Sequence, residues 1–219
     1  MARPPADQPL LTPDRIITVA LRLIDRDGAA ALSTRKLAAE LGVSNKAVYH
    51  YYANKEDLLR AVYLSILHQL ELPAGRDLPW PEQLRRFARS FRELARRHPS
   101  FLVDFLQPGC PALQELGALD VLYRLIREAG LPDPLMLHTG QLLLNFMIGY
   151  LRGEQSGEFN PEVYGASLDL AARHPGQFPT LEALPLPDSD TDALFSLAVN
   201  LLIGGLEATV AAARAQAPA

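Results

Sequence analysis

Basic, amide and aromatic side chains gather in one stretch near the start of the chain, STRKLAAELGVSNKAVYHYYANK, which spans residues 33–55. Arg35, Asn45, Lys46 and His50 carry groups that can hydrogen-bond to the edges of nucleic-acid bases. Hydroxyl and ammonium groups in the same stretch can contact phosphate oxygens, which position a protein on a duplex without reading its sequence. The chemistry that this stretch offers is therefore the recognition of a polyanion.

The charge of the chain is distributed unevenly. The whole chain has 21 basic and 25 acidic residues and a formal net charge of -4. Residues 1–55 hold eight basic and five acidic residues, and all the lysines of the chain lie between positions 36 and 55. Lysine is a flexible point charge suited to phosphate, so this distribution favours a small nucleic-acid-facing module on an acidic body. A solvated charged surface would give the same counts, so charge alone leaves both interpretations open.

Capping residues and glycines predict which elements position these side chains. Thr12, with Pro13 after it, begins a helix that ends at Gly28. Further helices are predicted over 34–41, over 45–51 and from 55 to 70. Gly42 forms a tight turn between the two short helices, and this layout is that of a helix-turn-helix, whose second helix enters the major groove of DNA. Apolar residues are spaced so that the two helices pack together and leave the polar face of the second one free: Leu37, Leu41, Val43 and Val48.

The rest of the chain also shows apolar residues at helical spacing, so we predict an all-α fold. Helices are expected near 82–97, 112–129, 134–152 and 190–213, with mainly a linker over 157–187. The last helix has apolar residues on two faces: Leu194, Leu197, Leu201 and Ala208 on one, and Phe195, Val199, Leu202, Leu206 and Val210 on the other. A helix that is apolar on two faces is buried on both, so we expect it to lie between its own core and a second copy in a homodimer.

Several other classes of protein find no support in the sequence. One cysteine, Cys110, excludes an internal disulfide and a cysteine-rich zinc site. The start of the chain lacks the apolar core of a signal peptide, and the uncharged run over 193–206 is short for a bilayer, so we expect no membrane association and a cytoplasmic protein. The motifs of phosphate-binding, dinucleotide-binding and nucleophile-elbow enzymes are missing, which leaves the competing hypothesis of a small helical enzyme without evidence.

The histidines and acidic residues do not have metal-ligand spacing, so we expect no metal and no cofactor. His68, His98, His138 and His174 form no paired motif. Asp188, Asp190 and Asp192 resemble the opening of a calcium loop, but alanine and valine stand where that loop needs glycine and glutamate.

The run LRLIDRDGAAALSTRKLAAELGVSNKAVYHYYANKEDLL resembles the DNA-binding region of the tetracycline-repressor (TetR) family of bacterial regulators. The resemblance is carried by the Arg35–Ala38 opening, the Leu41–Ser44 turn and the Val48-Tyr49 pair. It implies double-stranded operator DNA as partner, with phosphate contacts from Thr34, Tyr49 and Lys55. It also implies base contacts from Arg35, Asn45, Lys46 and His50, with Tyr51 supporting them.

Three later stretches resemble the effector domain of the tetracycline repressor itself: WPEQLRRFARSFRELARRHPSF, AGLPDPLMLHTGQLLLNFMIGYLRGEQ and DALFSLAVNLLIGGLEA. The resemblance implies a cavity for a small-molecule effector lined by Phe87, Phe91, Phe105, Leu119, Leu122, Leu137, His138, Gln141 and Asn145. The stretch that matches the repressor's metal-binding segment, residues 103–106, has no histidine. We therefore expect an apolar or aromatic effector bound without metal.

The resemblance implies a disordered arm over residues 1–11, a DNA-binding domain over 12–56 with its helix-turn-helix at 33–52, a connecting helix over 57–72 and an effector-binding and dimerisation domain over 73–219. The function implied is that of a repressor that binds a palindromic operator and is released by its effector. A body that responds to a protein partner, or to nothing, is the alternative that the sequence leaves open.

Overall fold

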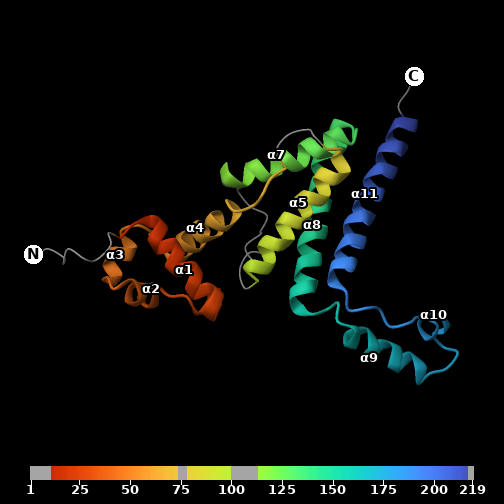
Figure 1. Cartoon of the computed structure of the whole chain (residues 1–219), viewed down its shortest axis with the longest axis horizontal. Helices are drawn as coiled ribbons and strands as arrows, with labels where there is room; N and C mark the ends of the chain where they lie inside the picture. Colours follow the sequence, from red (N-terminus) through yellow and green to blue (C-terminus); the bar gives the residue numbers. More distant parts are fainter. Residues whose placement is uncertain (1–10, 74–77, 100–112, 217–219) are drawn as a thin grey trace, which may run out of the picture. The chain divides into compact units, whose positions relative to one another are not determined.

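The computed structural model describes residues 11–73, 78–99 and 113–216, and this part of the chain is helical without any strand, which confirms the all-α prediction (Figure 1). The helices are α1 (Pro13–Asp27), the short 3₁₀ helix η1 (Ala29–Ala31), α2 (Thr34–Leu41), α3 (Asn45–Tyr49), α4 (Lys55–Leu67), α5 (Trp80–Arg97), α7 (Leu113–Glu128), α8 (Asp133–Ser156), α9 (Pro161–Ala172), α10 (Pro179–Glu182) and α11 (Thr191–Gln216). The expected arm over 1–11 lies almost wholly outside the described residues.

The first four α-helices begin where the capping residues predict, and α1 and α2 end at the predicted glycines. Thr12 accepts a hydrogen bond from the backbone N–H of Arg15, and Ser33, Ser44 and Asn54 cap α2, α3 and α4 in the same way. Gly42 ends α2 in the left-handed region at φ 69, where a side chain would be strained. Local sequence therefore sets where the two short helices start.

Two predicted helix ends are wrong by two or three residues. We expected α3 to reach residue 51 and α4 to reach residue 70, but they end at Tyr49 and Leu67. The N–H groups of Tyr51, Gln69 and Leu70 bond to carbonyls three residues back, which tightens the chain after each helix. The expected connecting helix over 57–72 accordingly begins at Lys55 and ends at Leu67.

The chain divides into two compact units. One unit contains Met1–Leu70 and Leu94–Gly117, and the other contains Glu71–Glu93 and Ala118–Ala219, so α5 and α7 contribute to both. The largest fully buried side chains of the first unit come from α1, α2, α4 and α5: Tyr63, Ile16, Leu23, Ile24, Leu37, Leu58, Ile66 and Leu94. The division into domains at residues 56 and 72 stays a prediction.

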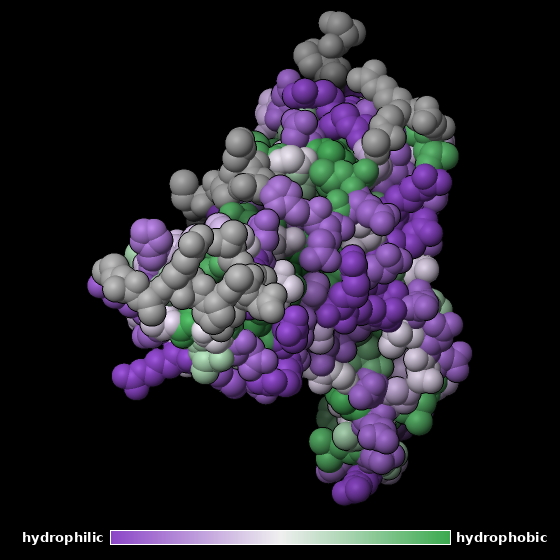
Figure 2. All heavy atoms as spheres, turned by 60° about the vertical axis from the view of Figure 1, so that its left-hand side comes forward, coloured by the Kyte–Doolittle hydropathy of each residue, from purple (hydrophilic) through white to green (hydrophobic). Residues whose placement is uncertain are grey.

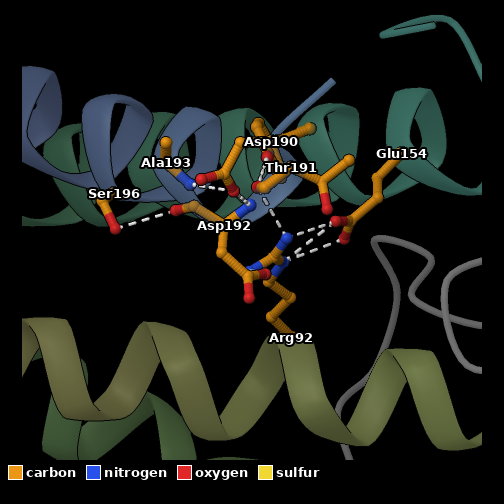
Figure 3. A network of polar contacts seen from close by, with 8 residues as sticks. Arg92, Glu154, Asp190, Thr191, Asp192, Ala193 and Ser196 are labelled. Atoms are coloured by element: carbon orange, nitrogen blue, oxygen red, sulfur yellow. Dashed lines mark hydrogen bonds and ion pairs between the residues drawn. The ribbon is translucent and has the colours of Figure 1, made fainter. Parts of the chain in front are cut away.

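In the second unit a buried arginine joins three helices. Arg92 of α5 pairs with Glu154 of α8 and Asp192 of α11, and it also donates to the backbone oxygen of Thr191 (Figure 3). The guanidinium lies over the ring of Phe195, with 4.4 Å between Cζ and the ring centroid. Burial by itself would lower the pKa of Arg92, but the hydrogen bonds and charge of Glu154 outweigh it, so the pKa is raised.

One face of α11 is buried and the other is exposed. Phe195, Val199, Leu206 and Val210 are buried, as is Ala198, whereas Leu197 and Leu201 expose 55% and 64% of their surface. The predicted two-sided apolarity therefore leaves one face uncovered in the single chain.

Residues 191–215 of α11 are long and apolar enough to cross a membrane, by length and composition alone. We expected no such segment, because we considered only the shorter uncharged run over 193–206. The core helix of a globular protein meets the same criterion, and the buried face of α11 packs against Tyr150 of α8.

The segment over 157–187 is more ordered than the predicted linker. Pro161 starts a three-turn helix, α9, and the four-residue α10 packs beside it. Proline is favoured in the first turn of a helix because its missing N–H has no partner there, and no second proline follows until position 175. The glycines and prolines of this segment predicted mainly a linker with at most short helical pieces, and α9 is longer than that.

The Arg92 network generates a prediction about stability. Replacing Arg92 with leucine removes the ion pair to Glu154, in which the two side chains are only 7% and 10% exposed. Loss of one partner of a buried ion pair costs about 3–5 kcal/mol of unfolding free energy, which urea denaturation measures. The matched control is Arg127→Leu, whose pair with Asp133 is 69% and 78% exposed and should cost about 0–1 kcal/mol. Equal losses in the two variants would contradict this account.

Candidate nucleic-acid interface and effector region

The α2–α3 hairpin is held by a small apolar core and one polar contact. Leu37, Leu41 and Val48 are buried, as the spacing predicts, while Val43 is half-buried. Thr34 of α2 donates from its hydroxyl to the Tyr49 hydroxyl of α3 at 3.3 Å. This contact brings together two of the residues expected to touch phosphate.

The polar face of α3 is open to solvent. Lys46, Tyr49 and His50 are exposed, and so is Arg35 at the start of α2. Asn45 is half-buried, and its side-chain oxygen Oδ1 is enclosed without a hydrogen-bond partner. Four of the five side chains are therefore accessible to a ligand. Arg35 lies at the start of α2, and Lys46, Tyr49 and His50 lie on α3 or directly after it.

Tyr51 and Lys55 also have partners within the chain. The Tyr51 hydroxyl donates to the backbone oxygen of Leu11 at 2.8 Å, and its ring meets His50 edge to face at 5.6 Å. Lys55 is half-buried, and its Nζ donates to the backbone oxygen of Ala30 at 3.3 Å. The Tyr51 contact supports the position of the neighbouring helix, and no spacing in the sequence indicates a contact forty residues apart.

Lys36 contributes to the positive charge of the module but is committed to an ion pair. Its Nζ lies 2.8 Å from Asp27 of α1, whose carboxylate also binds Arg26. Hydrogen bonds from Arg26 and then from Lys36 lower the pKa of Asp27 to about 2. Lys36 thus joins α2 to the end of α1, a role that its place in the basic run did not reveal.

The expected effector residues divide by burial. Phe87, Phe91 and Leu122 are buried and Leu119 is half-buried, whereas Leu137, His138, Gln141 and Asn145 are exposed on α8. Phe105 and the stretch 103–106 lie outside the described residues. One described hollow, of about 400 Å³, lies elsewhere, between α9 and α10 and the segment that follows them.

Two contacts join the end of α5 and the start of α7 to the DNA-binding helices within the first unit. His98, which follows α5, places Nδ1 3.3 Å from a carboxylate oxygen of Asp25 in α1. Arg60 of α4 pairs with Glu115 of α7. Movement at either position would reach the hairpin through α1 or α4.

Among the described residues, no group of three or more histidine, cysteine, aspartate or glutamate side chains could hold a metal ion. In the polar cluster around Arg92, the carboxylates of Glu154 and Asp192 pair with the guanidinium.

A helix-turn-helix with an open polar recognition helix, followed by a helical body, defines a DNA-binding transcription regulator. Residues 16–62 match the family described as bacterial regulatory proteins, tetR family, and residues 72–210 match the tetracyclin repressor-like C-terminal domain. The chain belongs to the TetR family. It is a ligand-responsive DNA-binding regulator and not an enzyme.

Individual members of the family are similar along nearly the whole chain. The TetR family protein ActR of Streptomyces coelicolor, solved in complex with actinorhodin, is 30% identical with a TM-score of 0.76, covering 92% of this chain and 99% of that one. The HTH-type transcriptional repressor DrrR1 of Streptomyces coeruleorubidus is 27% identical over 95% of this chain and 82% of its own length. The class A tetracycline repressor protein of Escherichia coli is 29% identical over 90% of each chain.

Proposed function

We propose that this protein is a homodimeric repressor that binds a palindromic operator and is released by an apolar or aromatic small molecule. The observation that carries the proposal is the α2–α3 hairpin, in which a buried core holds α3 while Lys46, Tyr49 and His50 stay exposed. Similarity to the repressor DrrR1 supports the sign of control. Binding to chromosomal operators would place the protein in the cytoplasm.

The homodimer is supported by uncovered apolar faces on two helices of the second unit. Leu142 and Phe146 of α8 expose 68% and 41% of their surface, and Leu197 and Leu201 of α11 are more than half exposed. Two helices from each chain would bury these faces in a four-helix bundle. A two-fold dimer carries two recognition helices related by symmetry, and a palindromic operator matches that symmetry.

The effector is proposed to contact the aromatic surface of α5. Phe87 and Phe91 lie one turn apart, buried with Leu122 of α7, and an uncharged lining disfavours a bare ion because desolvation is costly. ActR, which is similar over most of this chain, has been solved with actinorhodin and with (S)-DNPA. We propose that α4 carries the change to the DNA module, because a ligand releases DNA only by favouring a conformer with wrongly spaced recognition helices.

Selection of bound sequences from a random DNA pool tests the central proposal. The expected product is a palindrome whose half-sites lie one helical turn, about 34–36 Å, or a small multiple apart. Recovery of unrelated sequences, or of a single unrepeated half-site, would contradict it.

Lys46 and Lys55 should differ in the kind of DNA contact that they make. Lys46→Ala should cost about 1–3 kcal/mol at one base pair and relax the preference there, because Lys46 is proposed to contact a base. Lys55→Ala should weaken binding to all sequences alike and reduce the salt slope by about 1, because Lys55 is proposed to contact phosphate. Binding measured against a panel of single-base operator variants at several salt concentrations distinguishes the two. Identical selectivity profiles would count against both roles.

Dimerisation should depend on the exposed face of α11. Leu201→Glu places a charge where the second copy is proposed to pack, so the variant should sediment as a monomer at concentrations where the unchanged protein is a dimer. The control is Leu116→Glu on α7, which is 45% exposed and lies outside the proposed interface. A monomeric unchanged protein at micromolar concentration would exclude the interface.

Effector and operator should weaken each other's binding by the same factor. With actinorhodin and (S)-DNPA as probes, the dissociation constant of the ligand should rise by about 5 to 150-fold when saturating operator is present. Titration calorimetry with and without operator measures the change, and a chelator should leave it unaltered. Equal constants, or binding that requires magnesium, would refute the mechanism, and the absence of any small-molecule binding in a library would favour a protein partner instead.

A further inference from the structure

An amide pair lies on the exposed face of α8, among apolar side chains. Gln141 donates from Nε2 to the side-chain oxygen Oδ1 of Asn145 at 2.8 Å, one helical turn further along. Both residues are exposed, and each is followed by a large exposed apolar side chain, Leu142 or Phe146. Figure 2 shows that, on the face it draws, apolar side chains gather in patches within a largely hydrophilic surface.

The amide pair does not serve the interior of its own chain. The buried residues of α8 are Met136, Gly140, Tyr150, Leu151 and Gly153, and they define the inward face of the helix. The two amides belong to the outward face, which holds the proposed interface. Their place therefore fits contact with a second copy better than orientation of an effector within one chain.

The hydrogen-bonding groups that remain are complementary to themselves. Each amide has one oxygen and one NH₂ group, and the internal bond uses the Gln141 nitrogen and the Asn145 oxygen. The Gln141 oxygen Oε1 and the Asn145 nitrogen Nδ2 have no partner among the described residues. A two-fold interface brings residue i of one chain to residue j of the other and j to i, so a free acceptor and a free donor one turn apart can be satisfied twice at once.

We infer that in the dimer the Gln141 oxygen of each chain accepts a hydrogen bond from the partner subunit's Asn145, forming a reciprocal amide lock that selects the second copy and sets the register of α8. This inference rests on the proposed homodimer. A polar group in an apolar interface fixes register and partner at some cost in stability, because any other alignment leaves it buried and unpaired. Apolar faces such as those of Leu142 and Leu201 attract, but they discriminate poorly between chains of one family.

Complementary charges test the lock. Gln141→Glu and Asn145→Lys variants are purified separately, mixed under conditions of subunit exchange and analysed by native mass spectrometry. In the mixed dimer, the carboxylate introduced by Gln141→Glu in one chain faces the ammonium group introduced by Asn145→Lys in the other, and the second site keeps the natural amide pair. Random subunit exchange would give half mixed dimers. We expect mixed dimers to make up nearly all of the dimer population, because neither homodimer contains the charge pair.

The matched control uses the exposed surface of α5, where Arg89→Glu and Glu93→Lys also lie one turn apart but outside the interface. The control variants should form mixed and parental dimers in the statistical ratio, although each changes the charge of its chain more than Gln141→Glu or Asn145→Lys does. A statistical ratio for the Gln141 and Asn145 variants, or a mixture that stays monomeric, overturns the lock. If the unchanged protein is itself monomeric, the proposed dimer fails, and sedimentation of that protein separates the two outcomes.

Discussion

A charged group buried among apolar helices must be paired, and this constraint shapes the second unit. Arg92 satisfies it by contacting Glu154 of α8 and Asp192 of α11 from its position on α5 (Figure 3). Because Arg92 and its two carboxylate partners come from three helices, the ion pairs join α5, α8 and α11 at this point. The faces of α8 and α11 that stay exposed carry the uncovered leucines and the amide pair.

In the DNA-binding module, by contrast, the side chains proposed to contact DNA are exposed or half-buried and take no part in the core. Val48 is fully buried, whereas Lys46 and His50, two residues to either side, are exposed. A short helix can present such residues accurately only if its own position is fixed. The Thr34–Tyr49 hydrogen bond and the contact of Tyr51 with Leu11 supply that fixation.

A ligand-responsive regulator needs a physical connection between its body and its DNA-binding helices. The first unit contains two such connections, since His98 reaches Asp25 of α1 and Arg60 of α4 reaches Glu115 of α7. Charged contacts of this kind can be made in one conformer and lost in another, which is what differential ligand binding requires. The similarity to ActR and to the class A tetracycline repressor extends over both units.

Much of the DNA-binding module could be predicted from the sequence because its determinants are local. The caps at Thr12, Ser44 and Asn54, the left-handed glycine at 42 and the apolar spacing around Val48 act within one or two turns, and the hairpin formed as expected. The length of α9 was not predicted, because the glycines and prolines over 157–187 indicated mainly a linker, whereas Pro161 starts the helix. The contacts of Arg92, Lys36 and Tyr51 join residues from 9 to 100 positions apart, and no local pattern specifies such pairs. The outward orientation of Gln141 and Asn145 was also decided by tertiary structure, because which face of an apolar helix turns inward depends on what the neighbouring helices offer it.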